Sequence, residues 1–270
     1  MPSKFWNSIA VSSAGLLTLV FMLSAPVPGQ APAAKGPAKG ATKAVPRLPN
    51  GKPDLTGVWD HPRVGDFSKS FKGCVANSPG CSATAETTEF PWTAAGKAAN
   101  EADPKFDYGV HCLPWGYVRS WGTPYPLELI QKDHRLAILF EQNKWFHVVP
   151  TDGRKLEIEV PTWMGTSVGH WEGDTLVVET EGTNGQTWID TAEHPHSDAL
   201  RIVERFDRTD YDHIRHQVTI TDPKFLTKPM TNTSILVLTA PGTELYEYSC
   251  EENNKEIQDG HIKDAFTKGK

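Results

Sequence analysis

The densest group of potentially reactive side chains lies between Asp190 and Asp198, where the chain reads Asp-Thr-Ala-Glu-His-Pro-His-Ser-Asp. An imidazole, whose unperturbed pKa is about 6.5, suits proton transfer near neutral pH. His196 and Asp190 are therefore candidates for an acid-base pair in which the carboxylate orients the ring. His170 is a further catalytic candidate, although its position before Trp171 is equally suited to turn capping.

Two other interpretations of this loop stay open. As a metal site, His194 and His196 with Asp190 would supply ligands that Zn²⁺ accepts, and a His-x-His pair in an extended segment places both rings on one side. No fourth ligand stands at a diagnostic spacing, so we predict no metal. As an ordinary loop, Asp190 and Ser197 would satisfy backbone groups and His196 would pack its ring.

Two ionisable residues, Glu204 and His216, interrupt apolar strand faces, since side chains two apart along a strand point to the same side. Glu204 shares a face with Leu200, Ile202 and Phe206, and His216 shares one with Ile214, Val218 and Ile220. A carboxylate in an apolar layer must be paired, neutralised or functional. Glu204 is thus a candidate general acid or base. The alternative is an ion pair with an arginine, for which the candidates are Arg135, Arg201 and Arg215.

These side chains belong to a series of predicted strands. From Tyr125 onward, runs rich in β-forming residues alternate with turn sequences such as Asp152-Gly153 and Pro241-Gly242. With no βαβ alternation, we predict an all-β antiparallel meander of about eight to ten strands in a closed or nearly closed barrel, with a two-sheet β-sandwich as the alternative. The predicted strands are Leu127–Gln131, Leu136–Glu141, Trp145–Val149, Leu156–Val160, Ser167–Trp171, Thr175–Glu181, Leu200–Phe206, Ile214–Thr221, Ser234–Leu238 and Glu244–Cys250.

Upstream of the meander, the sequence predicts one strand, Leu55–Asp60, and then an irregular insert over residues 61–124. Only Trp92–Asp103 in the insert is predicted to be helical, because it is rich in alanine and Pro104 follows it.

The N-terminus predicts export. Lys4 precedes an apolar stretch that ends near Leu23, and small residues follow up to Ala33, as in a secretory signal peptide. We expect a signal peptide over 1–33, a flexible linker rich in Ala, Pro and Lys over 34–53, a single β domain over 54–252 and a polar tail over 253–270. The mature protein is expected to be periplasmic or secreted.

The chain has four cysteines, Cys74, Cys81, Cys112 and Cys250. An even number in an exported chain favours two disulfides over a thiol catalyst or a metal site. The spacing favours a small loop closed by Cys74 and Cys81, which leaves Cys112 with Cys250.

Composition limits the partners. The formal net charge is −6 at pH 7 and no cluster of Lys and Arg is present, so we expect no nucleic acid and no anionic membrane as a partner. The chain has no Gly-x-Ser-x-Gly elbow and no phosphate-binding glycine loop, so we expect no organic cofactor. The oligomeric state is left open.

The segment Gly57-Val58-Trp59 at the head of the meander resembles the Gly-x-Trp entry strand of lipocalin-like (calycin) barrels. That resemblance implies a lumen that holds one small apolar ligand. The sequence departs from the calycin pattern in two ways: a long insert separates Trp59 from Tyr125, and no late-strand arginine can be assigned as the partner of Trp59.

A second resemblance covers most of the mature chain. The segments that carry it are 49–59, 169–178 (Gly-His-Trp-Glu-Gly-Asp-Thr-Leu-Val-Val), Trp188-Ile189-Asp190 with Pro195-His196-Ser197, and Glu204-Arg205-Phe206. They resemble those of a large group of uncharacterised exported bacterial proteins. The resemblance implies secretion and a single domain, and it implies no activity.

Three functions follow as hypotheses. The first is a barrel that binds an apolar or aromatic small molecule, with Trp171, Trp188, Phe206 and His216 near the pocket and Glu204 as the polar anchor. The second is a cofactor-independent lyase, isomerase or hydrolase that uses His196 and Asp190 with Glu204 or His170. The third is a structural envelope protein, whose marks would be a filled barrel and an apolar outer patch.

Overall fold

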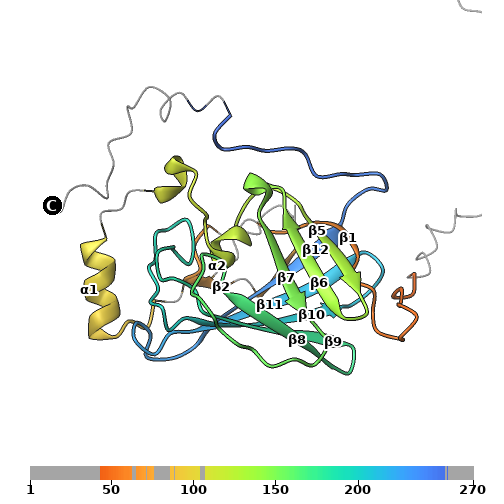
Figure 1. Ribbon diagram of the computed structural model, residues 1–270, viewed down its shortest axis with the longest axis horizontal. Helices are drawn as coiled ribbons and strands as arrows, with labels where there is room; N and C mark the ends of the chain where they lie inside the picture. Colours follow the sequence, from red (N-terminus) through yellow and green to blue (C-terminus); the bar gives the residue numbers. More distant parts are fainter. Residues whose placement is uncertain are drawn as a thin grey trace, which may run out of the picture. The chain divides into compact units, whose positions relative to one another are not determined.

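A computed structural model describes residues 43–62, 65–70, 72–75, 86–87, 89–103, 107–252 and 254 (Figure 1). All of them belong to one compact unit. Within these ranges, no helix combines the length and the apolar character that a membrane crossing requires.

One antiparallel sheet contains nine strands in the spatial order β7-β6-β5-β1-β12-β11-β10-β9-β8. If the two edge strands, β7 and β8, are placed side by side, the strands follow one another around the barrel in chain order. No strand ladder joins β7 to β8. The predicted nearly closed meander barrel is therefore confirmed, and the sandwich alternative is wrong. The strands are β1 (Gly57–Asp60), β5 (Leu127–Lys132), β6 (Arg135–Phe140), β7 (Phe146–Pro150), β8 (Thr166–Glu172), β9 (Thr175–Glu181), β10 (Arg201–Arg208), β11 (His213–Thr221) and β12 (Met230–Leu238).

Side chains bring β7 and β8 together where the ladder is missing. His147 Nε2 and Ser167 Oγ lie 2.5 Å apart. A Cβ atom on Gly169 would lie only 3.1 Å from Val149 Cγ1, so the absence of a side chain there lets β7 approach β8 closely.

The barrel interior follows the alternation expected for strands. In β10 and β11 every second residue is buried, which places Glu204 and His216 inside among apolar neighbours. The predicted shared faces of these two strands are confirmed.

The insert contributes the remaining described elements. Strand β3 adds to β12 in parallel, and the predicted helix is confirmed as α1, whose first turn is capped by the Thr93 hydroxyl. The elements are β2 (Lys69–Ser70), β3 (Lys72–Val75), β4 (Glu86–Thr87), α1 (Ala94–Ala102), the 3₁₀ turn η1 (Tyr108–His111) and α2 (Tyr117–Ser120), and a second 3₁₀ turn, η2 (Gln142–Lys144), connects β6 to β7.

Two predicted strands do not form. Leu156–Val160 lies in an irregular connection, where Ile158 packs so closely on Gly182 that an added Cβ there would lie 2.6 Å from its Cγ2 atom. Glu244–Cys250 is extended but belongs to no sheet. The last strand, β12, already has β11 on one side and β1 and β3 on the other, so no edge is left for a further strand.

An arginine does cover Trp59, contrary to the sequence-based expectation. The guanidinium carbon of Arg208, at the end of β10, lies 5.0 Å from the Trp59 ring centroid. It is fixed there by hydrogen bonds to the backbone carbonyls of Asp54 and Tyr211. Trp59 is fully buried, and its indole N–H donates to the Leu55 carbonyl at 3.1 Å.

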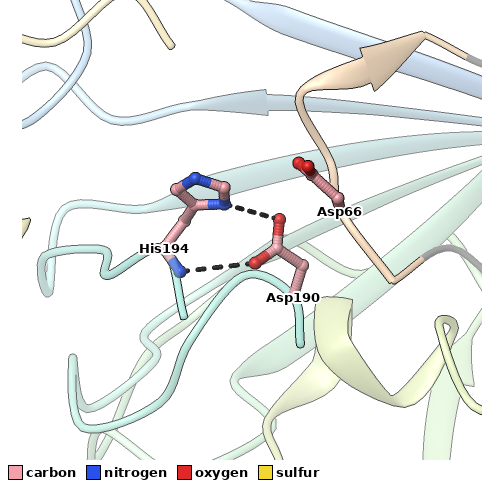
Figure 2. A group of neighbouring side chains, drawn as sticks. All are labelled: Asp66, Asp190 and His194. Carbon is pink, nitrogen blue, oxygen red and sulfur yellow. Dashed lines mark hydrogen bonds and ion pairs between the residues drawn. The ribbon is translucent and has the colours of Figure 1, made fainter. Parts of the chain in front are cut away.

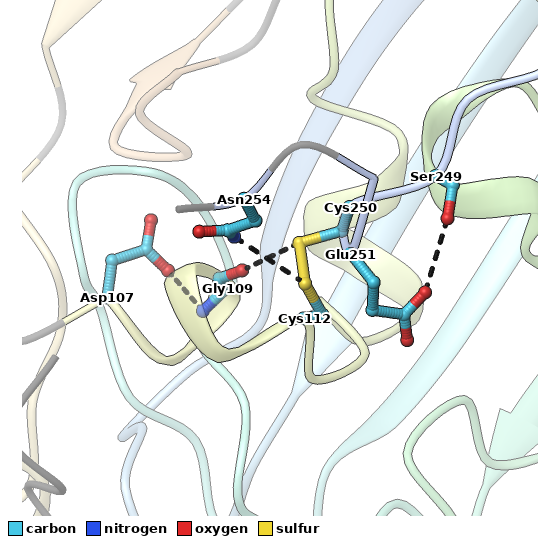
Figure 3. Close-up of a disulfide and its surroundings, with 7 residues drawn as sticks. All are labelled: Asp107, Gly109, Cys112, Ser249, Cys250, Glu251 and Asn254. Carbon is cyan, nitrogen blue, oxygen red and sulfur yellow. Dashed lines mark hydrogen bonds between the residues drawn. A yellow bond between two sulfur atoms is a disulfide. The ribbon is translucent and has the colours of Figure 1, made fainter. Parts of the chain in front are cut away.

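The long-range disulfide Cys112–Cys250 is confirmed, with the two Cα atoms 5.4 Å apart (Figure 3). It joins the residue that follows η1 to the C-terminal segment. Cys81 lies outside the described residues, so its pairing with Cys74 stays a prediction.

Candidate functional site

The centre of the site is Glu204 on β10, whose side chain is 0% exposed. The Tyr117 hydroxyl donates to Glu204 Oε2 at 2.7 Å, and His216 Nε2 lies 2.8 Å from Glu204 Oε1. Both carboxylate oxygens therefore have a partner. The ion pair expected with an arginine is wrong, because Arg201 pairs with Glu179 and Glu181, Arg215 pairs with Asp207, and Arg135 is exposed.

The sheet register and the insert together position these groups. Phe206 on β10 faces His216 on β11, so that Glu204 stands two residues away on the same inner face. Tyr117 comes from α2 in the insert and is 2% exposed. Gly116 precedes it with φ 84°, a left-handed conformation that favours glycine, and a Cβ there would lie 2.4 Å from Thr187 Oγ1.

Aromatic rings hold the imidazole of His216 in place. The Phe206 ring stacks on it with a centroid distance of 4.5 Å, and the Trp121 ring lies 4.1 Å away. Because the ring is fixed in this way, its Nε2 atom stays within hydrogen-bonding distance of the Glu204 carboxylate. An imidazole oriented by a carboxylate can act as a general acid or base.

Burial determines the protonation of Tyr117. Desolvation, and then the nearby Glu204 carboxylate, hold the Tyr117 pKa well above its ordinary value of 10. The hydroxyl therefore keeps its proton and donates it to Glu204 in a hydrogen bond.

A small cavity adjoins His216. It offers about 30 Å³ to the centre of a water molecule, enough for water but not for a larger molecule. Its walls are mainly apolar, from Phe67, Ile189 and Val218, with polar groups from His216 and Asn232.

His61 also lines this cavity. Burial lowers its pKa to about 4, so the ring is neutral at pH 7. The Nδ1–H donates to the Pro62 carbonyl at 3.3 Å, and no described residue hydrogen-bonds Nε2. His61 thus adds a second buried imidazole to the wall of the cavity.

A hydroxyl chain lies on the other side of Tyr117. The His147 ring centroid is 4.4 Å from that of Tyr117, and the chain runs from His147 Nε2 to Ser167 Oγ and on to Thr180 Oγ1 in two steps of 2.5 Å. The sequence-based prediction did not include His147. Its alternation with the buried Val149 places it on the inner face of β7, and the same alternation identified Glu204.

The two neutral imidazoles make stability depend on pH. Burial lowers the pKa of His61 and of His147 to about 4, whereas an unfolded histidine titrates near about 6.5. Between these values the unfolded chain binds more protons, so acidification lowers the free energy of unfolding. We expect His147→Gln to remove about 2 kcal/mol of the loss between about pH 7 and pH 4.5, measured by urea unfolding. The exposed control His134→Gln should keep the full pH dependence, and an undiminished loss in His147→Gln would contradict the assignment.

The Asp190 loop is organised differently from the predicted acid-base pair. Asp190 accepts hydrogen bonds from the backbone N–H groups of Phe67 (2.6 Å), Ala192 (3.0 Å) and His194 (3.3 Å). Its side-chain partner is His194, at 2.8 Å from Nδ1, and not His196 (Figure 2). The interpretation as an ordinary loop fits this geometry, because the carboxylate stabilises three backbone groups.

His196 is satisfied elsewhere. Its Nδ1–H donates to the Ser197 carbonyl at 2.8 Å, and its Nε2 accepts from the Thr187 hydroxyl at 2.7 Å. Burial lowers its pKa, so the ring stays neutral near pH 7. With both nitrogens bonded, His196 is not poised to exchange a proton with a substrate.

The structure does not bring His194, His196 and Asp190 together as one set of metal ligands. Asp66 instead approaches Asp190 and His194, with one ligand atom of each within 4.8 Å of the others (Figure 2). Asp66 Oδ1 already accepts from the Ser68 N–H at 2.9 Å and from the Ser68 hydroxyl at 2.5 Å. Hydrogen bonds from the chain thus already occupy both oxygens of Asp190 and one oxygen of Asp66.

We expect Asp190→Ala to lower the free energy of unfolding by about 2–3 kcal/mol, because it leaves the buried N–H of Phe67 and the partly buried N–H groups of Ala192 and His194 without their acceptor. Urea unfolding followed by tryptophan fluorescence measures the change. The control is Asp198→Ala, which removes only an exposed pair with Lys224 and should stay close to wild type. Equal effects of the two variants would show that the Asp190 loop is not a structural element.

Of the predicted ligand-binding residues, Phe206 and His216 lie together beside Glu204, and Trp188 and Trp171 lie elsewhere. Trp188 forms an aromatic cage with Tyr108 and Trp115 around the guanidinium of Arg119, at ring distances of 4.3–5.2 Å. Asp107 binds the same guanidinium through both oxygens, so the cage is already filled.

The remaining predicted residues lie near the β8–β9 hairpin. Trp171 is partly exposed, and the Lys52 ammonium lies 5.7 Å from its ring. His170 is exposed, and its Nε2 is 3.4 Å from Glu172 Oε1. Neither residue contacts Glu204 or His216 among the described interactions.

Comparison of the chain with protein-family models, curated proteins and solved structures finds no match.

Proposed function

We propose that this protein binds a small, mainly apolar molecule in the barrel interior, with His216 as the group that recognises its polar part and Glu204 as the group that orients His216. The observation that carries the proposal is the fully buried Glu204–His216 pair at 2.8 Å, beside a cavity with apolar walls. Ligand pockets combine an apolar lining with a few convergent polar groups, as this cavity does.

The size of the cavity limits how the ligand is held. The open space beside His216 has the size of a water molecule, so only a small polar group of the ligand fits there. An apolar body of larger size requires the Phe67 and Val118 side chains, which form the wall, to move apart.

The location is part of the proposal. The Cys112–Cys250 disulfide fits an oxidising compartment, and the apolar N-terminus followed by small residues supports export. The ligand is therefore a molecule met outside the cytoplasm.

Native mass spectrometry of the protein isolated from a bacterial periplasm tests the proposal. We expect an adduct that is lost on denaturation and that is absent from Glu204→Gln and His216→Gln. The control His213→Gln changes a histidine at the start of the same strand that pairs with Asp210 and should keep the adduct. A bare mass for the wild-type protein, or an adduct kept by both site variants, would contradict the proposal.

A second function, proton transfer without a cofactor, is favoured by the same pair, because Glu204 holds the His216 ring at the edge of a cavity. 5-Nitrobenzisoxazole, which opens when a base removes a proton, is a suitable probe. We expect the ring-opening rate to fall in His216→Ala, and equal rates for the two proteins would count against this function.

A further inference from the structure

The chain after β12 forms a strap, defined here as residues 239–252, that passes over the outside of the barrel (blue in Figure 1). Interactions along its length fasten it to the barrel and to the insert. The Tyr246 N–H donates to Glu141 Oε2 at 2.8 Å, Glu247 pairs with Lys144 at 2.8 Å, and Cys250 is bonded to Cys112 (Figure 3). The strap therefore has a fixed position over η2 and its neighbours.

Between the strap and the outer wall of β6 and β7 lies a groove of about 360 Å³. Its walls include Leu139, Trp145, Phe146, Leu245 and Tyr246. The volume falls in the range of small-molecule sites, about 300–1,000 Å³. It is about twelve times the space beside His216, so this groove is the larger of the two apolar sites.

The exposed aromatic rings of the groove favour a flat ligand. Phe146 is 68% exposed and Tyr246 is 81% exposed, and Trp145 adds a third ring to the same groove. Exposed aromatic faces gain most from stacking on another ring or a flat apolar molecule. A groove of this volume has room for a compact aromatic molecule.

The charges around the groove disfavour an anionic ligand. Glu141 is buried in its wall, and Lys144, the cation of the groove, is already paired with Glu247. An anionic ligand would lie beside these two carboxylates with no unpaired cation among the described residues of the groove. A neutral ligand meets no such cost.

We propose that the groove under the strap is a binding site for a neutral aromatic small molecule, separate from the interior site. The strap forms its roof, and the disulfide, the Glu141 hydrogen bond and the Lys144 pair keep the roof at a fixed distance from the wall.

Benzophenone is a suitable probe, because it is neutral, aromatic and inserts into nearby C–H bonds on irradiation. We expect irradiation of the oxidised protein to label peptides that contain residues 137–146 or 244–246. The anionic analogue 4-benzoylbenzoate should label them about tenfold less, a ratio that corresponds to a tenfold difference in affinity. Labels confined to peptides with Phe67, Trp121 or Ile189 would place the molecule at the interior site and overturn this proposal. The peptide that carries the label thus separates the two proposals.

A phenylalanine that fills the groove, and the same substitution elsewhere on the barrel, give a matched pair of variants. Ala137 lies on the outer face of β6 in the groove wall, so Ala137→Phe should reduce groove labelling about tenfold. Val203→Phe adds the same ring to the outer face of β10, away from the groove, and should label as wild type. Equal labelling of the two variants, or equal labelling by the neutral and anionic probes, would overturn the proposal. A dimer in sedimentation that Ala137→Phe dissociates would identify a second copy as the occupant instead.

Discussion

Replacing both Cys112 and Cys250 by serine is expected to lower the free energy of unfolding by about 4–5 kcal/mol. The bond joins residues separated by 138 positions, more than half of the chain. Closing a loop of this length restricts the unfolded chain by about 5 kcal/mol in the chain-entropy description. The strap also loses its attachment to η1, so its other contacts with the barrel weaken.

Urea unfolding monitored by tryptophan fluorescence measures this loss as a shift of the midpoint. Ser249→Ala is the matched control, because Ser249 lies next to Cys250 and its hydroxyl bonds only the exposed Glu251, at 3.2 Å. Chemical reduction of the wild-type protein is a poorer test, since it would also break the predicted bond between Cys74 and Cys81. A loss below about 1 kcal/mol would mean that the unfolded chain keeps the two segments together without the bond.

The fold could be predicted from local signals wherever neighbouring strands follow one another in the chain. Alternating apolar residues specify β8 to β12, and each of these strands pairs with the next one along the chain. The two wrong strands fail for different reasons that local patterns do not contain. Whether an extended segment joins a sheet depends on a free edge, and β12 offers none to residues 244–250. Residues 156–160 stay irregular although β7 and β8 have free edges, because Ile158 packs on Gly182 instead.

The centre of the site could be predicted only in part. Alternation identified Glu204 and His216 as inward-facing, because that depends on the strand alone. Their partner Tyr117 lies in the irregular insert, 87 residues before Glu204, and no sequence pattern relates the two. The same limit explains Arg208, which reaches Trp59 from a strand that does not pair with β1.

The density of polar residues in the Asp190 loop reflects backbone bonding and not the predicted acid-base pair. Asp, Ser and His side chains that are close in sequence bond the backbone around them, and here those bonds hold the loop against Phe67. Sequence proximity thus indicated a local scaffold, whereas the more isolated Glu204 has partners from distant segments.

The interior cavity is small, and the outer wall carries exposed apolar side chains. Both features are expected of a structural envelope protein, so that hypothesis remains an alternative to the binding proposals. Benzophenone labelling distinguishes them, because a surface that serves only protein contacts would show no label concentrated on the peptides of the groove.

We expect Glu204→Leu to lower the free energy of unfolding by about 3–5 kcal/mol, although leucine is similar in size to glutamate. The change leaves His216 and the Tyr117 hydroxyl without their partner in an apolar interior. His216→Leu should cost a similar amount, because it leaves a carboxylate buried with one hydrogen bond fewer. The double variant removes both polar groups and should be at least about 2 kcal/mol more stable than the sum of the single losses predicts.

Urea unfolding of the four proteins gives the coupling energy, and Tyr117→Phe is the control for the loss of one hydrogen bond, at about 1–2 kcal/mol. Strictly additive losses would mean that Glu204 and His216 do not act as a pair. A double variant as stable as the wild-type protein would show that apolar residues serve the fold equally well at both positions. The buried pair would then have no structural reason to be present, and a role of His216 in ligand recognition or in proton transfer would explain it.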